Sequence, residues 1–336
     1  MHNFIYPLIS FIISAVVCFL IIKAGQKFTK FYDTLNKSHA VHKSPVPRVG
    51  GIALLTALIL TGFFLKNQFI HKIIFFITLA SIVGLIEDLK KDISPKIRLL
   101  TLIIISTLAV VIFEIKINNI GFAELPDFFG IPLTIIAIAG FTNAMNIIDG
   151  LNGLASGIAL TFLLFLGLTF HEAGSQYFST LCFIIAGATT GFLIFNFPKG
   201  KIFLGDSGSY FLGFSCAILS LELIKVHPHI SPWFPLILGI FPVWEVLFSA
   251  YRRKRKNAHP FQPDKLHLHT LLYYRVTRSN PKASFLIVLG NFLFSSVAYI
   301  FRTCSVCLIF ELLLFIFIYT GIYRRIVCFQ YQQLKF

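Results

Sequence analysis

The sequence predicts an all-α integral membrane protein, a polytopic bundle of about 11 transmembrane helices. Of the 336 residues, 56% are hydrophobic and only 13% are charged, and the mean hydropathy is +0.81. Soluble domains carry about 25% charged residues, so this composition excludes an ordinary soluble domain. Apolar runs of the length that crosses a bilayer as a helix, about 20 residues, recur along the whole chain.

Polar breaks between the apolar runs give the expected bounds of the spans. They are residues 4–23, 49–65, 69–86, 98–115, 130–147, 153–170, 177–195, 209–226, 232–250, 283–301 and 304–322. Two spans are weaker, because one begins with Val49-Gly50-Gly51 and the last holds Glu311 near its centre. Since the sequence contains no polar domain between the spans, we expect residues 1–336 to form a single polytopic membrane domain.

The distribution of Lys and Arg predicts how the bundle is oriented. One face is expected to hold the loops 24–48, 87–98, 196–208 and 251–282. Together with the adjoining Lys23 and the C-terminal tail, this face carries 24 of the 29 Lys and Arg residues. Such an excess marks the cytoplasmic side, so we expect the N-terminus outside and the C-terminus in the cytoplasm. The net charge of +15 then reflects orientation and attraction to anionic membrane lipids, and no nucleic-acid partner is expected.

The first polar segment that suggests chemistry is GLIEDLKKDISPKIRLL, residues 84–100. Glu87 and Asp88 are adjacent at the end of an apolar helix. Neighbouring carboxylates repel unless a cation lies between them or one keeps its proton. A cation site is therefore one interpretation, and a solvated helix end followed by a basic loop is the other.

The second segment is FTNAMNIIDGLNGLASG, residues 141–157. Its polar side chains recur every three residues, on roughly one helical face: Asn143, Asn146, Asp149 and Asn152. Amide and carboxylate groups at this spacing suit a pocket for phosphate, ribose or metal. The alternative is a buried hydrogen-bond network between helices.

The third segment is NFPKGKIFLGDSGSYFLGF, residues 196–214, in which Gly205-Asp206-Ser207 opens the next span. Backbone N–H groups and a carboxylate meet there at a helix N-terminus, an arrangement that suits a phosphate or a metal-bridged phosphate. A simple N-cap is the alternative.

The fourth segment is HPFQPDKLHLHTLLYYR, residues 259–275. His267 and His269 alternate there, and Asp264 lies three residues before the first. Zinc would need further ligands, whereas pyrophosphate binding by imidazole and Lys265 fits the basic surroundings. Solvated loop histidines are the alternative. Another pair, Cys304 and Cys307, lies in an apolar run, and we interpret it as small packing residues.

These four segments, in this order, resemble the polyprenyl-phosphate N-acetylhexosamine-1-phosphate transferases, glycosyltransferase family 4. Relatives include phospho-N-acetylmuramoyl-pentapeptide transferase. The segments that carry the resemblance are GLIEDLKKDISPKIRLL, NAMNIIDGLNGLASG, FLGDSGSYFLGF and PDKLHLHTLL, with HKSPVPRVGG (42–51) before them. The similarity runs from about Asp33 to Tyr274, and all four motifs are expected on one face of the bundle.

The resemblance implies a reaction in which undecaprenyl phosphate attacks a UDP-N-acetylhexosamine such as UDP-GlcNAc. UMP leaves and an undecaprenyl-pyrophosphoryl HexNAc remains, the initiating step of cell-surface glycan synthesis such as lipopolysaccharide O-antigen. It also implies Mg²⁺, with Mn²⁺ as an alternative, a homodimer, and an active site on the cytoplasmic face of the bacterial inner membrane.

By resemblance, roles fall on particular positions of this chain. We expect Asp206 and Asp88 to bind the metal, and Glu87, Asp88 and Asp149 to be catalytic. The nucleotide-sugar would contact Asn143, Asn146, Asp149, Asn152, His267 and His269. Lys96, Arg98 and Lys265 would contact phosphates.

Four positions depart from the family pattern. Glu87 replaces the first Asp of an Asp-Asp pair, and Asn152 replaces the second Asp of D-G-x-D-G. Glu245 stands where Asp is expected, and Thr270 replaces a third His. Two other functions are weighed against the transferase: a transporter or flippase for a lipid-linked sugar, which predicts broken helices and polar residues at mid-bilayer, and a catalytically inactive homologue that binds nucleotide-sugar.

Overall fold

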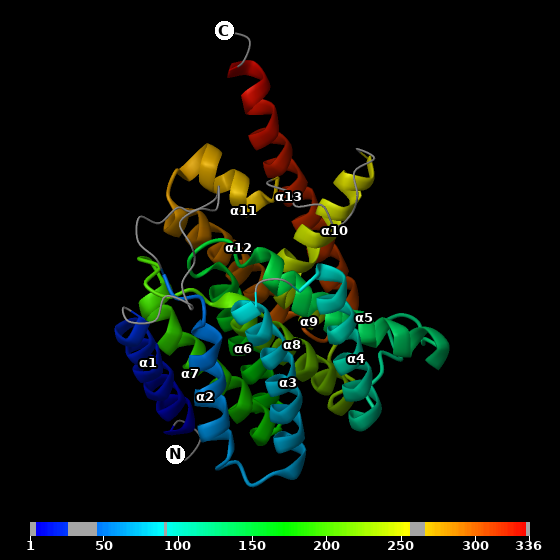
Figure 1. The fold of residues 1–336 in the computed structure, drawn as a ribbon. Helices are drawn as coiled ribbons and strands as arrows, with labels where there is room; N and C mark the ends of the chain where they lie inside the picture. Colours follow the sequence, from blue (N-terminus) through cyan, green and yellow to red (C-terminus); the bar gives the residue numbers. More distant parts are fainter. Residues whose placement is uncertain (1–4, 26–45, 91–92, 256–265, 334–336) are drawn as a thin grey trace.

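The computed structural model describes residues 5–25, 46–90, 93–255 and 266–333 (Figure 1). Within these ranges the chain is helical apart from its connections, which include an isolated β-bridge between Asn119 and Glu124. The helices are α1 (Ile5–Gly25), α2 (Gly50–Gly62), α3 (Gln68–Lys90), α4 (Pro95–Phe113), α5 (Asp127–Ile148), α6 (Leu154–Glu172), α7 (Gln176–Asn196), α8 (Gly205–Val226), α9 (Trp233–Leu238), α10 (Ile240–Arg255), α11 (Leu268–Leu271), the π-helical turn η3 (Leu272–Thr277), α12 (Asn280–Ile300) and α13 (Ser305–Gln333). The all-α membrane fold is confirmed.

Nine helices in the described part of the chain are long and apolar enough to cross a membrane. The other two predicted spans differ from expectation. Residues 49–65 form the shorter α2, of 13 residues, and residues 232–250 form two helices, α9 and α10, instead of one. With α9 and α10 taken as one broken pass, the described helices cross the bundle eleven times. The N- and C-terminal ends therefore lie at opposite ends of it (Figure 1).

The break between α9 and α10 has a local cause. Pro242 has no backbone N–H to donate to the carbonyl of Leu238, four residues earlier. That carbonyl instead accepts a hydrogen bond from Nδ2 of Asn291 on α12, at 3.0 Å. The connecting Gly239 packs so closely on Phe141 that a Cβ atom there would lie 2.3 Å from the ring.

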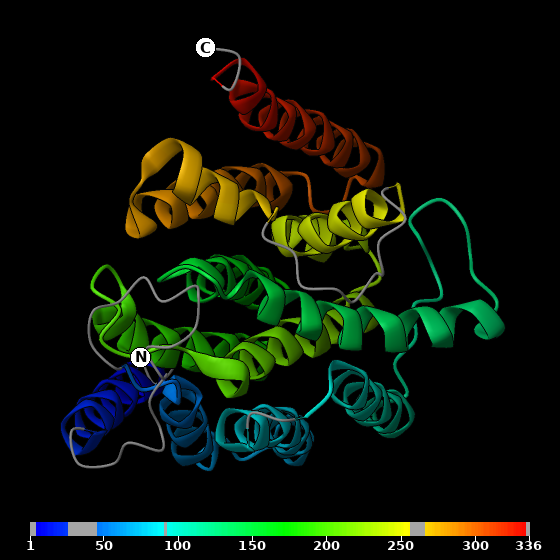
Figure 2. The same cartoon turned by 45° about the horizontal axis from the view of Figure 1, so that its top comes forward.

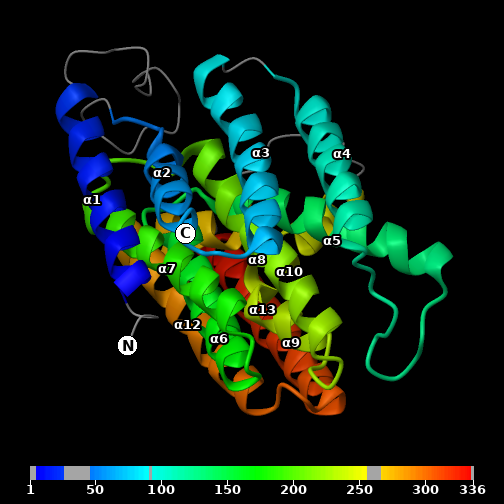
Figure 3. The same ribbon diagram turned by 90° about the horizontal axis from the view of Figure 1, so that it is seen from below.

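The bundle has three layers, which Figures 2 and 3 show from two directions. Helices α1 to α4 form one outer layer, α5 to α8 the middle, and α10, α12 and α13 the other outer layer. The middle layer is the most enclosed. In an apolar 18-residue stretch of each helix, 83% of the residues are buried in α8 and 78% in α6, against 17% in α1. Helix α8 is therefore the central element of the fold.

Two sequence interpretations are corrected by the structure. Cys304 and Cys307 are joined by a disulfide bond just before and within the first turn of α13, and so are not simple packing residues. Glu311 is the seventh residue of α13 rather than the centre of a span, because this helix continues to Gln333.

Candidate active site

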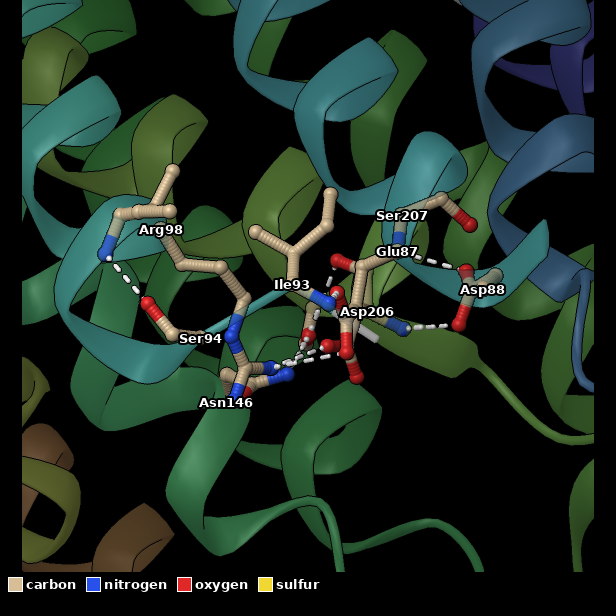
Figure 4. A network of polar contacts seen from close by, with 10 residues as sticks. Glu87, Asp88, Ile93, Ser94, Arg98, Asn146, Asp206 and Ser207 are labelled. Carbon is tan, nitrogen blue, oxygen red and sulfur yellow. Dashed lines mark hydrogen bonds and ion pairs between the residues drawn. The ribbon is translucent and has the colours of Figure 1, made fainter. Parts of the chain in front are cut away.

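The site is built where the end of α3 meets the start of α8 (Figure 4). The carboxylate of Asp88 accepts the backbone N–H groups of Asp206 and Ser207, each at 2.9 Å. These two N–H groups belong to the first turn of α8, where no partner is available within the helix and where the helix dipole favours an anion. Asp88 therefore caps α8 from a different helix, so the N-cap that we considered for Asp206 is made by Asp88.

Two glycines allow this close approach. A Cβ atom on Gly84 of α3 would lie 2.3 Å from the carbonyl oxygen of Asp206. Gly205 has a φ of +75°, in the left-handed region that favours glycine, and a Cβ there would lie 2.7 Å from Oδ2 of Asp88. Larger residues at either position would separate the two carboxylates.

Arg98 connects Asp206 with the acidic pair. Its Nη1 lies 2.8 Å from Oδ2 of Asp206 and 3.8 Å from Oε1 of Glu87. Arg98 is in the first turn of α4, which begins with the Ser94 cap and Pro95 at the first helical position. The predicted phosphate contact thus lies between two predicted acidic residues. Lys96, in the same turn, is exposed.

The asparagines of the second segment divide into two groups. On α5, Nδ2 of Asn146 donates to Oγ of Ser209 at 2.9 Å, and that hydroxyl donates to the carbonyl of Asp206 at 3.1 Å. Asn143 lies one turn earlier and is half-buried. These contacts join the end of α5 to the start of α8.

Asn152 is only 6% exposed and belongs to a different network. Its backbone N–H donates to Oδ1 of Asn280, at 2.8 Å, and its Nδ2 donates to the carbonyl of Pro198, at 3.1 Å. The structure thus gives Asn152 the buried-network contacts that were the alternative for this segment.

Asp149 directly follows α5 and is half-buried. Burial raises the pKa of its carboxyl to about 7; the positive charge of Arg48 opposes this shift, and the carboxylates of Asp206 and Asp88 add to it. Asp149 is thus close enough to both acidic residues to feel their charge, and the predicted catalytic carboxylates share one end of the bundle.

The histidine segment lies over the same turn. The rings of His267 and His269 are stacked with centroids 5.5 Å apart. Nε2 of His269 is 3.1 Å from the position that a Cβ on Gly150 would take, beside Asp149. Burial lowers the pKa of His269 to about 4, against the opposing effect of the Glu245 carboxylate, so this imidazole is neutral at pH 7. Lys265 and Asp264 lie outside the described residues.

Three residues without a predicted site role also belong to this geometry. Arg48 acts electrostatically on Asp149 and packs its carbonyl against Gly205. Ser209 joins α5 to α8. Glu245, named from the sequence only as a departure from the family pattern, binds the histidine segment.

Comparisons with known proteins identify a family and relatives for this chain. Residues 70–224 match the family model described as Glycosyl transferase family 4, a range that contains Glu87, Asp88, Asp149 and Asp206. A probable undecaprenyl-phosphate N-acetylglucosaminyl 1-phosphate transferase of Bacillus subtilis (strain 168) is 28% identical over 323 residues, 91% of this chain and 89% of the relative.

Two enterobacterial relatives are both called undecaprenyl-phosphate alpha-N-acetylglucosaminyl 1-phosphate transferase. The protein of Salmonella typhi is 30% identical over 69% of this chain and 66% of its own length. That of Yersinia pestis is 27% identical over 77% of this chain and 74% of its own length. With its membrane fold and its gathered acidic motifs, the chain belongs to glycosyl transferase family 4 and is a glycosyl-1-phosphate transferase.

Proposed function

We propose that this enzyme transfers a HexNAc-1-phosphate from a UDP-N-acetylhexosamine to undecaprenyl phosphate. An oxygen of the lipid phosphate attacks the sugar-bearing β-phosphorus, the bond from that phosphorus to the bridging oxygen breaks, and UMP leaves with that oxygen. The observation that carries the proposal is the convergence of Asp88, Asp206 and Arg98 at the ends of membrane helices. The names of the relatives support GlcNAc as the sugar and undecaprenyl phosphate as the acceptor.

Arg98 and Asp206 would exchange partners when substrate binds. In the structure the guanidinium is bonded to Asp206 and lies near Glu87. A planar guanidinium binds phosphate oxygens as readily as carboxylates, so Arg98 can turn from Asp206 to the diphosphate. That change would leave the Asp206 carboxylate available as a ligand for a cation.

The donor set fits Mg²⁺. This ion prefers oxygen ligands and is commonly held by one or two carboxylates plus substrate phosphates. Asp206 and Asp88 would supply the carboxylates, and in the described ranges no three His, Cys, Asp or Glu side chains form a ready-made metal site, so phosphates would complete the shell. When bound, the ion would neutralise charge on the diphosphate, and Mn²⁺ offers the same preference for oxygen.

An apolar groove supports a polyprenyl acceptor. A cavity of about 510 Å³ lies between α5, α8, α9 and α10, and its lining includes Gly140, Phe141, Leu221, Trp233 and Leu247. An isoprenoid chain has no polar groups, so an apolar groove in a membrane-embedded wall can hold it beside the headgroup site. We propose that the lipid phosphate then reaches the acidic residues at the end of α5.

The remaining predicted residues would hold the donor. His269 is neutral, so it offers a hydrogen-bonding nitrogen rather than a positive charge to the sugar or diphosphate. Asp149 and Asn146, at the end of α5, would face the nucleotide. We infer from the positive-inside distribution of Lys and Arg that this end of the bundle faces the cytoplasm, where UDP-sugars are available, and that the membrane is the bacterial inner membrane.

The test uses purified protein in detergent with undecaprenyl phosphate, Mg²⁺ and a panel of UDP-HexNAc donors, with UMP release as the readout. We expect UMP that requires the lipid, Mg²⁺ and one donor, and that is lost in Asp206→Asn. A matched control is Asp127→Asn, which removes an exposed carboxylate bonded to Lys116 at the start of α5. Folded protein that binds UDP-sugar but releases no UMP with any donor would contradict the proposal.

A further inference from the structure

Glu245 is a fully buried carboxylate on α10 whose partners come from two other parts of the chain. Its Oε1 accepts from Nδ1 of His267, at 2.9 Å, and from the backbone N–H of Leu268, at 3.0 Å. Its Oε2 accepts from the hydroxyl of Tyr319 on α13, at 2.9 Å, and lies 3.2 Å from the Leu268 nitrogen. A buried carboxylate destabilises a fold unless hydrogen-bond donors surround it. The burial of Glu245 therefore depends on the donors from the histidine segment and from α13.

A second set of bonds fixes the residue before the histidines. Nη1 of Arg252 on α10 donates to the carbonyl of Leu266, at 2.7 Å, and to the hydroxyl of Tyr323 on α13, at 2.9 Å. That hydroxyl also lies 3.3 Å from the Leu266 carbonyl. Residues 266–268 are therefore held by α10 and α13 together. Each helix contributes two side chains, Glu245 and Arg252 from α10 and Tyr319 and Tyr323 from α13.

This attachment decides where the imidazoles lie. His267 is only 9% exposed and stacks on His269, whose Nε2 meets the turn at Gly150. Glu245 is bonded to Nδ1 at the edge of the His267 ring, and its charge also acts on His269. The carboxylate thus acts on the active-site turn through one histidine ring packed on another.

We propose that Glu245 is a positioning residue of the transferase, which orients His267 and holds the histidine segment against the Asp149–Gly150 turn. The inference rests on the proposed function for what the histidines bind. With Nδ1 of His267 donating to the carboxylate, Nε2 is the ring nitrogen left to face the substrate, as in other carboxylate–histidine pairs. Tyr319 extends the same support to α13.

The kinetic test compares Glu245→Gln, Glu245→Asp and Tyr319→Phe. We expect Glu245→Gln to lower kcat/KM roughly 10- to 100-fold, because small displacements of active-site groups have effects of this size. Glu245→Asp, which keeps the charge, should retain most of the wild-type activity. Tyr319→Phe should give a smaller loss, and the matched control Tyr299→Phe, which removes a hydroxyl bonded to Glu172 at the other end of the bundle, should give none.

Non-additivity distinguishes positioning from a general loss of stability. If Glu245 acts through His267, the double variant Glu245→Gln/His267→Ala should be no slower than His267→Ala alone. Additive losses, or a Glu245→Gln enzyme with wild-type kcat/KM, would overturn the inference. A wild-type enzyme without UMP release would instead count against the proposed function.

Hydrogen exchange tests the inference without turnover. The N–H of Leu268 donates to Glu245, so Glu245→Gln should speed amide exchange in a peptide covering residues 266–272. We expect an increase of roughly 10-fold or more there, far larger than any change in α8, together with a modest fall in the thermal midpoint, because the Gln amide turns an N–H group toward donors that the carboxylate accepts. Unchanged exchange in that peptide would overturn the proposal whatever the activity, and faster exchange throughout the protein would show a loss of folding instead of positioning.

Discussion

The carboxylate of Asp88 accepts the backbone N–H of Asp206 across 118 positions of sequence, at 2.9 Å, and so joins α3 to the first turn of α8. One predicted acidic residue therefore holds the backbone of another. A change at Asp88 should affect both the fold and the reaction, whereas a change at the Asp206 side chain should affect the reaction more selectively.

Asp88→Asn and Asp206→Asn test this difference. An amide at residue 88 keeps one acceptor but turns an N–H group toward the N–H groups of α8. We therefore expect Asp88→Asn to lose about 1–2 kcal/mol of stability together with UMP release. Asp206→Asn should lose UMP release while its unfolding midpoint in detergent stays close to wild type. Equal midpoints for the two variants would show that the cap contributes little.

Asp149 predicts a pH dependence. Burial raises the pKa of its carboxyl from 3.8 to about 7, so if the anion is needed, UMP release should rise with pH to a plateau above about pH 7. Above pH 3.8 the unfolded chain ionises this group more readily than the folded one, so the raised pKa lowers stability increasingly between pH 4 and 7.

Asp149→Asn should therefore be inactive and also more stable than wild type at pH 8. The difference in unfolding midpoint should shrink as the pH falls toward 4, where both side chains are neutral. Midpoints measured across this range check the sign, and a variant that is less stable at pH 8 would contradict the argument.

Asn152→Asp gives a prediction that the family pattern alone would not. The side-chain Nδ2 donates to the carbonyl of Pro198, so a carboxylate would turn an oxygen toward that oxygen at a partly buried contact. We expect a loss of about 1–3 kcal/mol of stability and no gain in UMP release per folded molecule. Higher activity would show that the side chain faces substrate during turnover.

The Cys304–Cys307 disulfide offers a test of orientation. It lies at the connection between α12 and α13, the end of the bundle opposite Asp206. Structural disulfides persist in oxidising compartments, which agrees with that end facing away from the cytoplasm. In intact cells treated with an impermeant reductant, an impermeant maleimide should label these thiols, and Cys304→Ser/Cys307→Ser should not be labelled at this site. Labelling only after permeabilisation would reverse the orientation.

The positions of the spans could be predicted from sequence because the bilayer sets a requirement that each segment meets by itself. About 20 apolar residues make a span wherever they occur, and most expected bounds agree with the helices within a few residues. The exceptions needed information from elsewhere. The carbonyl freed by Pro242 is bonded by Asn291 on α12, so a long apolar run contains two helices.

The four polar segments were also visible in the sequence, as carboxylates, amides and imidazoles at helix ends, where such groups suggest function. What each side chain does was decided by the tertiary structure. Asp88 caps a helix from another part of the chain, Asn152 joins three segments, and Glu245 holds a histidine 22 positions away. Hydrophobic length is a local property of the chain, but a hydrogen bond has two partners, and only the packing of the helices determines which ends meet.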